Sequence, residues 1–239
     1  MAKPGEAILS QLLSLLFPLR CAHCGVCGDE LCLSCRARLK PIGPTSCRRC
    51  GKPSLYDVPE CRECRGRRLH FGSAQAAFRY AGPARSAIHR LKYSGRRHLA
   101  GVMAEATHSH PRLAGLTEKT GEVTLTYVPV HASRKFSRGY NQAELYARAL
   151  SKTLGLPLAG LLVKNFPTTP QNRLNFNDRG KNLSDSFSVR RGYGVETPKV
   201  LLVDDVYTTG ATVSECSRVL TADLGVVVDV WTFARTVKN

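Results

Sequence analysis

Residues 200–213 constrain the fold more than any other part of this 239-residue chain. They read Val-Leu-Leu-Val-Asp-Asp-Val-Tyr-Thr-Thr-Gly-Ala-Thr-Val. The apolar run predicts a buried strand, and the small residues after it predict a turn into a helix over Val213–Leu224. The loop Thr208–Thr212 can bend its amides around a phosphate, which the positive N-terminal end of the helix also attracts. Asp204 and Asp205 are placed to hold sugar hydroxyls or a hydrated Mg²⁺, and we expect both carboxylates to be exposed.

After about residue 70 the chain alternates between strand-like and helix-like segments. This alternation predicts an α/β fold, with a mostly parallel sheet flanked by helices and ligands at the carboxyl ends of the strands. We therefore predict two domains that meet near residue 70, at residues 1–70 and 71–239. The predicted strands are 76–80, 123–130, 161–164, 187–190, 199–206 and 226–234; the predicted helices are 84–91, 97–106, 142–154 and 213–224, and 166–185 is a predicted long loop.

The first 70 residues are rich in Cys, Gly, Pro and Arg, and they contain too few apolar residues to fold without metal. Nine of the ten cysteines fall between positions 21 and 64, and eight of them form Cys-x-x-Cys pairs. Two such pairs complete a tetrahedral zinc site, which also indicates a reducing, cytoplasmic compartment. Sequential and crossed pairing both satisfy the spacing, and Cys27 is interpreted as a spare thiol. The predicted ligands of two structural zinc ions are Cys21, Cys24, Cys32, Cys35, Cys47, Cys50, Cys61 and Cys64.

The charge of the chain is strongly positive. It carries 35 Lys plus Arg against 18 Asp plus Glu, a formal net charge of +17. This balance favours a polyanionic partner, with nucleic acid ahead of an anionic membrane surface. Basic side chains that follow phosphates, with an aromatic ring for base stacking, are typical of single-strand binding. The predicted cluster consists of Arg85, Arg90, Lys92, Tyr93, Arg96 and Arg97.

Residues 8–19 are the most apolar stretch near the N-terminus. Their apolar residues recur with helical spacing, and Pro18 closes the run. We interpret the stretch as an amphipathic docking helix, and we expect no stable membrane insertion because no run reaches the length of a transmembrane helix.

Four pieces of the chain together resemble a known family. They are the cysteine pairs preceded by Leu-Phe-Pro; Phe-Arg-Tyr at 78–80 with Ile-His-Arg-Leu-Lys-Tyr-Ser-Gly at 88–95; Val-Pro-Val-His at 128–131 with Arg-Gly-Tyr-Asn-Gln-Ala at 138–143; and Asp-Asp-Val-Tyr-Thr-Thr-Gly-Ala-Thr at 204–212. In this order and spacing, residues 15–235 resemble the ComF (ComFC) family of bacterial competence-associated proteins. The last piece also resembles the signature with which type I phosphoribosyltransferases bind phosphoribosyl pyrophosphate (PRPP).

The resemblance implies a type I phosphoribosyltransferase-like domain behind a small N-terminal zinc ribbon. It implies that Asp204 and Asp205 contact the ribose hydroxyls of PRPP, which binds together with Mg²⁺. The same two residues are the candidate catalytic residues. It implies that the segment after the second strand meets pyrophosphate, with Lys135 and Arg138 as further cations. The implied PRPP-binding residues are Asp204, Asp205, Thr208, Thr209, Gly210, Ala211, Thr212, His131, Ala132, Ser133 and Arg134, and Arg138 joins the predicted nucleic-acid contacts.

Three functions follow from these observations. The first, implied by the resemblance, is a factor for DNA uptake in natural transformation that binds single-stranded DNA and PRPP and cooperates with a DNA-translocating helicase. The second is an active phosphoribosyltransferase on a nucleobase or nucleic acid; the five residues after the last predicted strand leave little chain for a base-recognising hood. The third is a zinc-ribbon adaptor whose main partner is another protein.

Overall fold

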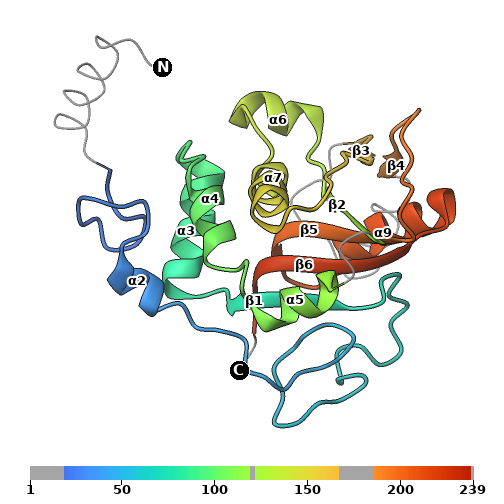
Figure 1. Ribbon diagram of the computed structural model, residues 1–239, viewed down its shortest axis with the longest axis horizontal. Coiled ribbons are helices and arrows are strands. Elements are labelled where there is room, and N and C mark those ends of the chain that lie inside the picture. The colour runs from blue at the N-terminus through green and yellow to red at the C-terminus, as the bar shows by residue number, and fades with distance from the viewer. Residues whose placement is uncertain (1–18, 119–121, 167–185, 238–239) are drawn as a thin grey trace.

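The computed structural model describes residues 19–118, 122–166 and 186–237 (Figure 1). The predicted helix at 8–19 and the predicted loop at 166–185 lie almost wholly outside these ranges. The central sheet has the strand order β1-β6-β5-β2, and all of its neighbouring strands run parallel. Its strands are β1 (Ala74–Arg79), β2 (Val123–Tyr127), β5 (Lys199–Tyr207) and β6 (Val227–Arg235), and a separate antiparallel pair contains β3 (Leu162–Lys164) and β4 (Phe187–Val189). The predicted α/β fold with a mostly parallel sheet is confirmed.

Strand β5 is buried on both faces, as its apolar run predicts. Leu201 and Val203 pack into one hydrophobic core, with residues of α3, α4 and α7, whereas Val200 and Leu202 pack into a second core with α9. The sheet is therefore covered on both sides. The helices are α2 (Leu33–Ala37), α3 (Gly82–Tyr93), α4 (Leu99–Glu105), α5 (Pro111–Thr117), α6 (Ala132–Arg138), α7 (Gln142–Leu154) and α9 (Ala211–Leu224).

Three short helices, α2, α5 and α6, were not predicted. Each has seven residues or fewer, too few to show a helical repeat of apolar residues. Helices α5 and α6 begin after a histidine that accepts a hydrogen bond from a backbone amide two residues later: His110 for α5 and His131 for α6. A histidine is not one of the usual capping residues, so its signal in the sequence is weak.

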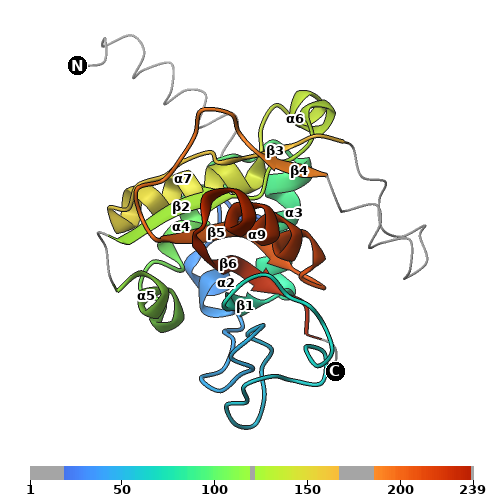
Figure 2. The same ribbon diagram turned by 90° about the vertical axis from the view of Figure 1, so that its right-hand side faces the viewer.

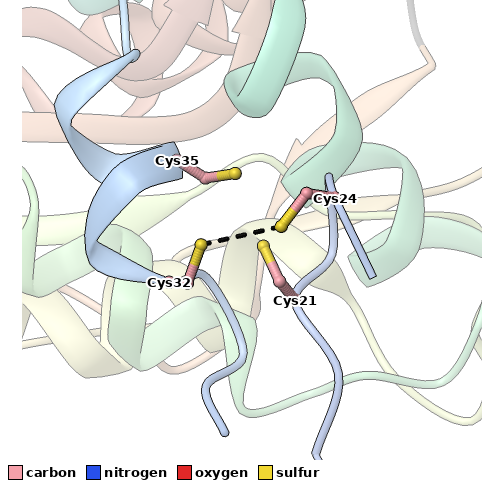
Figure 3. A group of neighbouring side chains, drawn as sticks. All are labelled: Cys21, Cys24, Cys32 and Cys35. Atoms are coloured by element: carbon pink, nitrogen blue, oxygen red, sulfur yellow. Dashed lines mark hydrogen bonds between the residues drawn. The ribbon is translucent and has the colours of Figure 1, made fainter. Parts of the chain in front are cut away.

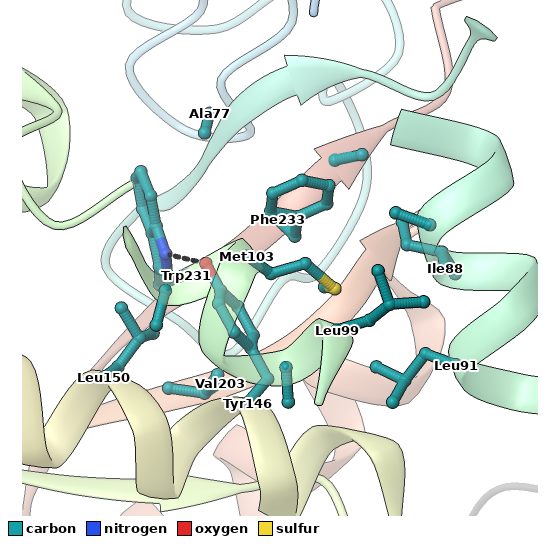
Figure 4. Close-up of a cluster of buried hydrophobic side chains, with 14 of the residues drawn as sticks. Ala77, Ile88, Leu91, Leu99, Met103, Tyr146, Leu150, Val203, Trp231 and Phe233 are labelled. Carbon is teal, nitrogen blue, oxygen red and sulfur yellow. Dashed lines mark hydrogen bonds between the residues drawn. The ribbon is translucent and has the colours of Figure 1, made fainter. Parts of the chain in front are cut away.

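The first core contains a buried Trp231–Tyr146 hydrogen bond within apolar surroundings (Figure 4), and Thr107 extends it to three side chains. Trp231 donates from Nε1 to Tyr146 Oη at 2.9 Å, and Tyr146 Oη lies 3.0 Å from Thr107 Oγ1. All three side chains are fully buried. Because each polar atom has a partner, these large rings are buried without an unsatisfied donor or acceptor.

The cysteine-rich segment packs against the α/β domain along the β1 edge of the sheet. Ile42 donates its amide to the Ala77 carbonyl and Arg79 donates its amide to the Lys40 carbonyl, each at 2.8 Å. Arg112 of α5 reaches the same segment, donating to the carbonyls of Gly43 and Pro44 and to Ser46 Oγ. In both views residues 47–64 and α6 lie at opposite ends of the molecule (Figure 2).

Candidate ligand cleft and metal centres

The eight predicted zinc ligands form two separate groups, and their pairing is sequential. In each group all four sulfur atoms lie within 4.8 Å of one another. Figure 3 shows the group that is first in the chain, with its four side chains converging. The Sγ atoms of Cys24 and Cys32 lie 3.7 Å apart in one group, and in the other Cys61 Sγ lies 3.7 Å from both Cys50 Sγ and Cys64 Sγ. Zn–S bonds of about 2.3 Å in a tetrahedron place the sulfurs about 3.8 Å apart, so both groups fit a zinc ion. Four thiolates leave no open position on the metal, as a structural role requires. The groups are Cys21, Cys24, Cys32 and Cys35, and Cys47, Cys50, Cys61 and Cys64.

Cys27 is exposed and belongs to neither group. This placement agrees with its interpretation as a spare thiol. We name the two groups the first zinc centre and the second zinc centre, in chain order.

A cleft of about 280 Å³ lies where β2 and β5 end. It contains both predicted acids, two threonines of the predicted phosphate loop and five residues from the segment after β2, among them His131 and Arg134. Segments distant in the sequence therefore converge as the parallel topology predicts. We name it the acidic cleft; its lining includes Lys92, His131, Arg134, Gln142, Lys164, Asp204, Asp205, Thr208 and Thr212.

The two acids differ in their surroundings. Asp205 is only 3% exposed, and the expectation that both carboxylates are exposed is wrong for this residue. Lys92 of α3 explains the difference, because its Nζ lies 2.6 Å from Asp205 Oδ2 and compensates the buried charge. Burial opposes the charge of Lys92, but Asp205 more than offsets it and raises the pKa of Lys92 above its usual value.

Asp204 is half-buried and lines the cleft. Burial and the adjacent Asp205 charge raise the pKa of Asp204 to about 8, against the opposing effect of Lys92. Its Oδ1 accepts the Asp205 amide at 2.9 Å. Because the charged form of this carboxyl group is disfavoured, a ligand that supplies positive charge, such as Mg²⁺, would stabilise it strongly.

The predicted phosphate loop connects β5 to α9. Gly210 has a φ of +78°, and a Cβ atom there would overlap the Tyr207 ring, so the backbone can take this path only with glycine. Thr208 and Thr209 are exposed, and Thr208 and Thr212 line the acidic cleft. Helix α9 starts at Ala211 and directs its N-terminal amides toward the loop.

The segment predicted to meet pyrophosphate enters helix α6. His131 and Arg134 line the acidic cleft, whereas Ala132 and Ser133 are exposed and are not part of its lining. His131 Nδ1 lies 2.8 Å from Ser133 Oγ and accepts the Ser133 amide, which fixes the start of the helix.

The predicted nucleic-acid contacts fall into two groups. Lys92 is paired with Asp205, and Arg96 is paired with Glu30 and donates to the Arg20 carbonyl, so these two cations connect elements of the fold. The others are accessible: Arg85, Arg90, Tyr93 and Arg97 are exposed, and Arg138 is half-buried with its guanidinium 5.5 Å from the Tyr93 ring centre.

A second, larger cleft of about 640 Å³ adjoins the first. It shares Lys92 and Arg134 with the acidic cleft, and none of its lining residues is acidic. We name it the basic cleft; it is lined by Lys92, Tyr93, Gly95, Arg134, Ser137, Arg138 and Tyr140.

Lys164 and Gln142 also line the acidic cleft, although neither was predicted to have a functional role. Burial and the nearby Arg134 charge lower the pKa of Lys164. An anion bound between Lys164 and Arg134 would relieve this repulsion. The only signal in the sequence was the position of Lys164 at the end of a predicted strand, since ligands collect at strand ends.

Residues 12–65 match the model of the double zinc ribbon domain family, in agreement with the two zinc centres. The chain is 32% identical to Competence protein F of Haemophilus influenzae, over 92% of this chain and 98% of that protein. It belongs to the Competence protein F family. Other members of similar length include DNA utilization protein YhgH of Escherichia coli, 29% identical over 92% of this chain and 94% of that protein. Competence protein ComFC of Bacillus subtilis is 26% identical over 80% of this chain and 78% of that protein.

This member of the Competence protein F family has two separately built features: two zinc centres on the N-terminal segment, and two adjoining clefts on the α/β domain. Within the described ranges, its helices are all too short or too polar to cross a membrane.

Proposed function

We propose that the protein is a DNA-uptake factor of natural transformation that binds single-stranded DNA and Mg²⁺-bound PRPP. One observation carries the proposal: acids, phosphate loop and cations converge in the acidic cleft, and a basic cleft with an exposed tyrosine adjoins it. The names of the relatives, competence proteins and DNA utilization proteins, support a role in handling DNA.

The acidic cleft supplies one group for each part of PRPP. Thr208, Thr212 and the N-terminal amides of α9 suit the 5-phosphate. Asp204 suits the ribose hydroxyls and Mg²⁺, while Asp205 keeps Lys92 in place. Arg134 and Lys164 suit the pyrophosphate, whose charge they would neutralise. Domain 71–239 would thus hold the small ligand, and segment 1–70 would hold the zinc ions.

The proposed strand-binding surface uses the accessible cations of α3 and its surroundings. Arg85, Arg90 and Arg97 are exposed, as phosphate contacts must be, and Tyr93 is 67% exposed. A DNA-translocating helicase in the cytoplasm would be the partner that delivers or receives the strand.

The test is a titration of the protein with fluorescently labelled single-stranded DNA, read by anisotropy at several salt concentrations. Binding to several phosphates predicts a steep fall of affinity with salt. Calorimetry with Mg²⁺-bound PRPP tests the second ligand, with Asp204→Asn as the variant that should lose affinity and Arg90→Ala as the control that should keep it. Absence of strand binding at low salt would refute the DNA-uptake role.

Phosphoribosyl transfer is the second candidate, because most of the side chains proposed to orient PRPP line one cleft. Release of pyrophosphate that requires single-stranded DNA or a nucleobase would favour the enzyme. PRPP that remains intact with every acceptor would leave it as a bound effector.

A further inference from the structure

We infer that a base of the single strand stacks on Tyr93 inside the basic cleft, and that the neighbouring phosphate competes with PRPP for Arg134. The inference rests on the proposed binding of both ligands and assigns each a place. It also predicts that each ligand weakens the binding of the other.

The basic cleft has the composition of a single-strand site. Its walls carry two arginines and a largely exposed tyrosine, Tyr93, and include no carboxylate that would repel a phosphate. Arg138 lies over the ring of Tyr93, and the His89 ring lies on α3 with its centre 4.8 Å from that of Tyr93. These neighbours hold the aromatic ring in place at the mouth of the cleft, where a base can stack on it.

Arg134 is the cation that the two clefts share and that remains available. Lys92 also lines both clefts, but its ammonium is committed to Asp205 at 2.6 Å. Arg134 is exposed, and its guanidinium has no ion-pair partner among residues 19–118, 122–166 and 186–237. A pyrophosphate in the acidic cleft and a strand phosphate in the basic cleft would both bind the Arg134 guanidinium, so each would weaken the binding of the other.

Helix α6 supplies a matched control on its opposite face. Arg134, Ser137 and Arg138 line the basic cleft and are three or four residues apart, so they share one face of the helix. Phe136 lies about 200° round the helix from Arg134 and is 91% exposed. Phe136 is therefore an exposed ring on the same helix that faces away from the cleft.

Tryptophan fluorescence tests the inference directly. The chain has one tryptophan, Trp231, which is fully buried, so a second one at an exposed position gives a separate signal. We expect single-stranded DNA to quench the new tryptophan of Tyr93→Trp by stacking, and to leave that of Phe136→Trp unchanged. An oligomer of abasic sugar-phosphates should bind more weakly and should not quench either variant.

Addition of Mg²⁺-bound PRPP should then weaken strand binding several-fold in the wild type and restore the fluorescence of Tyr93→Trp. By thermodynamic reciprocity the strand must weaken PRPP binding by the same factor. Arg134→Ala should weaken each ligand alone and bring the mutual effect close to onefold.

The outcomes separate the inference from the proposed function. If the wild type binds the strand but Tyr93→Trp is not quenched, or if Phe136→Trp is quenched equally, the assignment of the basic cleft is wrong and the DNA-uptake role stands. If PRPP binds without weakening the strand, the sharing of Arg134 is wrong. If the wild type binds no strand, both the inference and the proposed function fall.

Discussion

Arg67, three residues after the last ligand of the second zinc centre, donates a hydrogen bond from Nη2 to the Thr209 carbonyl oxygen of the phosphate loop at 2.8 Å. A second connection runs through Arg235, which donates to the Cys50 carbonyl and lies with its guanidinium 4.9 Å from the Tyr207 ring centre. The Tyr207 ring in turn packs against Gly210. The second zinc centre and the phosphate loop are therefore parts of one packed unit.

The first zinc centre packs elsewhere. His23 Nδ1 lies 2.9 Å from Ser86 Oγ of α3, and Glu30 pairs with Arg96 between α3 and α4. These contacts reach the helix that carries Tyr93 and do not involve the phosphate loop. The two metal centres thus support different parts of the molecule.

Loss of the second zinc ion should weaken PRPP binding more than loss of the first. Cys61→Ser and Cys32→Ser form a matched pair, because both cysteines are half-buried ligands. Each variant should retain one zinc per chain by elemental analysis. We expect Cys61→Ser to reduce the affinity for Mg²⁺-bound PRPP about tenfold or more, and Cys32→Ser to leave it within about twofold, measured by calorimetry. Equal losses in the two variants would contradict the separate support of the phosphate loop.

Lys92→Ala should destabilise the protein. It leaves the Asp205 carboxylate buried and uncompensated, and removal of one partner of a buried ion pair costs about 3–5 kcal/mol. Urea denaturation at pH 8 should show the loss. Arg90→Ala is the control: Arg90 is exposed on the same helix and should change the free energy of unfolding by less than about 0.5 kcal/mol. A small effect of Lys92→Ala at pH 8 would show that Asp205 has another source of compensation.

The affinity for Mg²⁺-bound PRPP should rise with pH. The pKa of Asp204 is raised to about 8 in the ligand-free protein, so at lower pH this carboxyl group is mostly protonated and a cation must displace the proton. A single group of this pKa predicts a rise of about tenfold from pH 7 to pH 9, with proton release that fades above pH 9. Calorimetry in buffers of different ionisation enthalpy counts the released protons. Asp204→Asn should bind weakly and show neither effect; a wild-type affinity that is flat over this range would exclude Asp204 as the cation ligand.

The sequence predicted the parts of the site that are local in the chain. The strand, loop and helix at 199–224 and the four Cys-x-x-Cys pairs each lie within a short segment, so their spacing carries the information. The sequential pairing of the cysteines needed the structure, because crossed pairing has equally good spacing. The Lys92–Asp205 ion pair could not be predicted either. In the sequence Lys92 is one of several cations in a basic cluster, and only the position of α3 in the fold places its ammonium next to the Asp205 carboxylate. The continuity of the two clefts likewise depends on where α6 lies.

Gly210→Ala should remove PRPP binding through the shape of the loop. Gly210 has a φ of +78°, and an added methyl group would overlap Tyr207, so the loop must move to accept it. Gly155→Ala is the control for backbone strain alone, because Gly155 has a φ of +67° and nothing within 4 Å of an added Cβ. Both variants should lose about 1–2 kcal/mol of stability from the left-handed backbone. Only Gly210→Ala should lose PRPP affinity, by at least about tenfold in calorimetry, because the phosphate loop begins α9 whereas Gly155 ends α7. If Gly210→Ala binds PRPP as tightly as Gly155→Ala, the 5-phosphate is held by another part of the cleft.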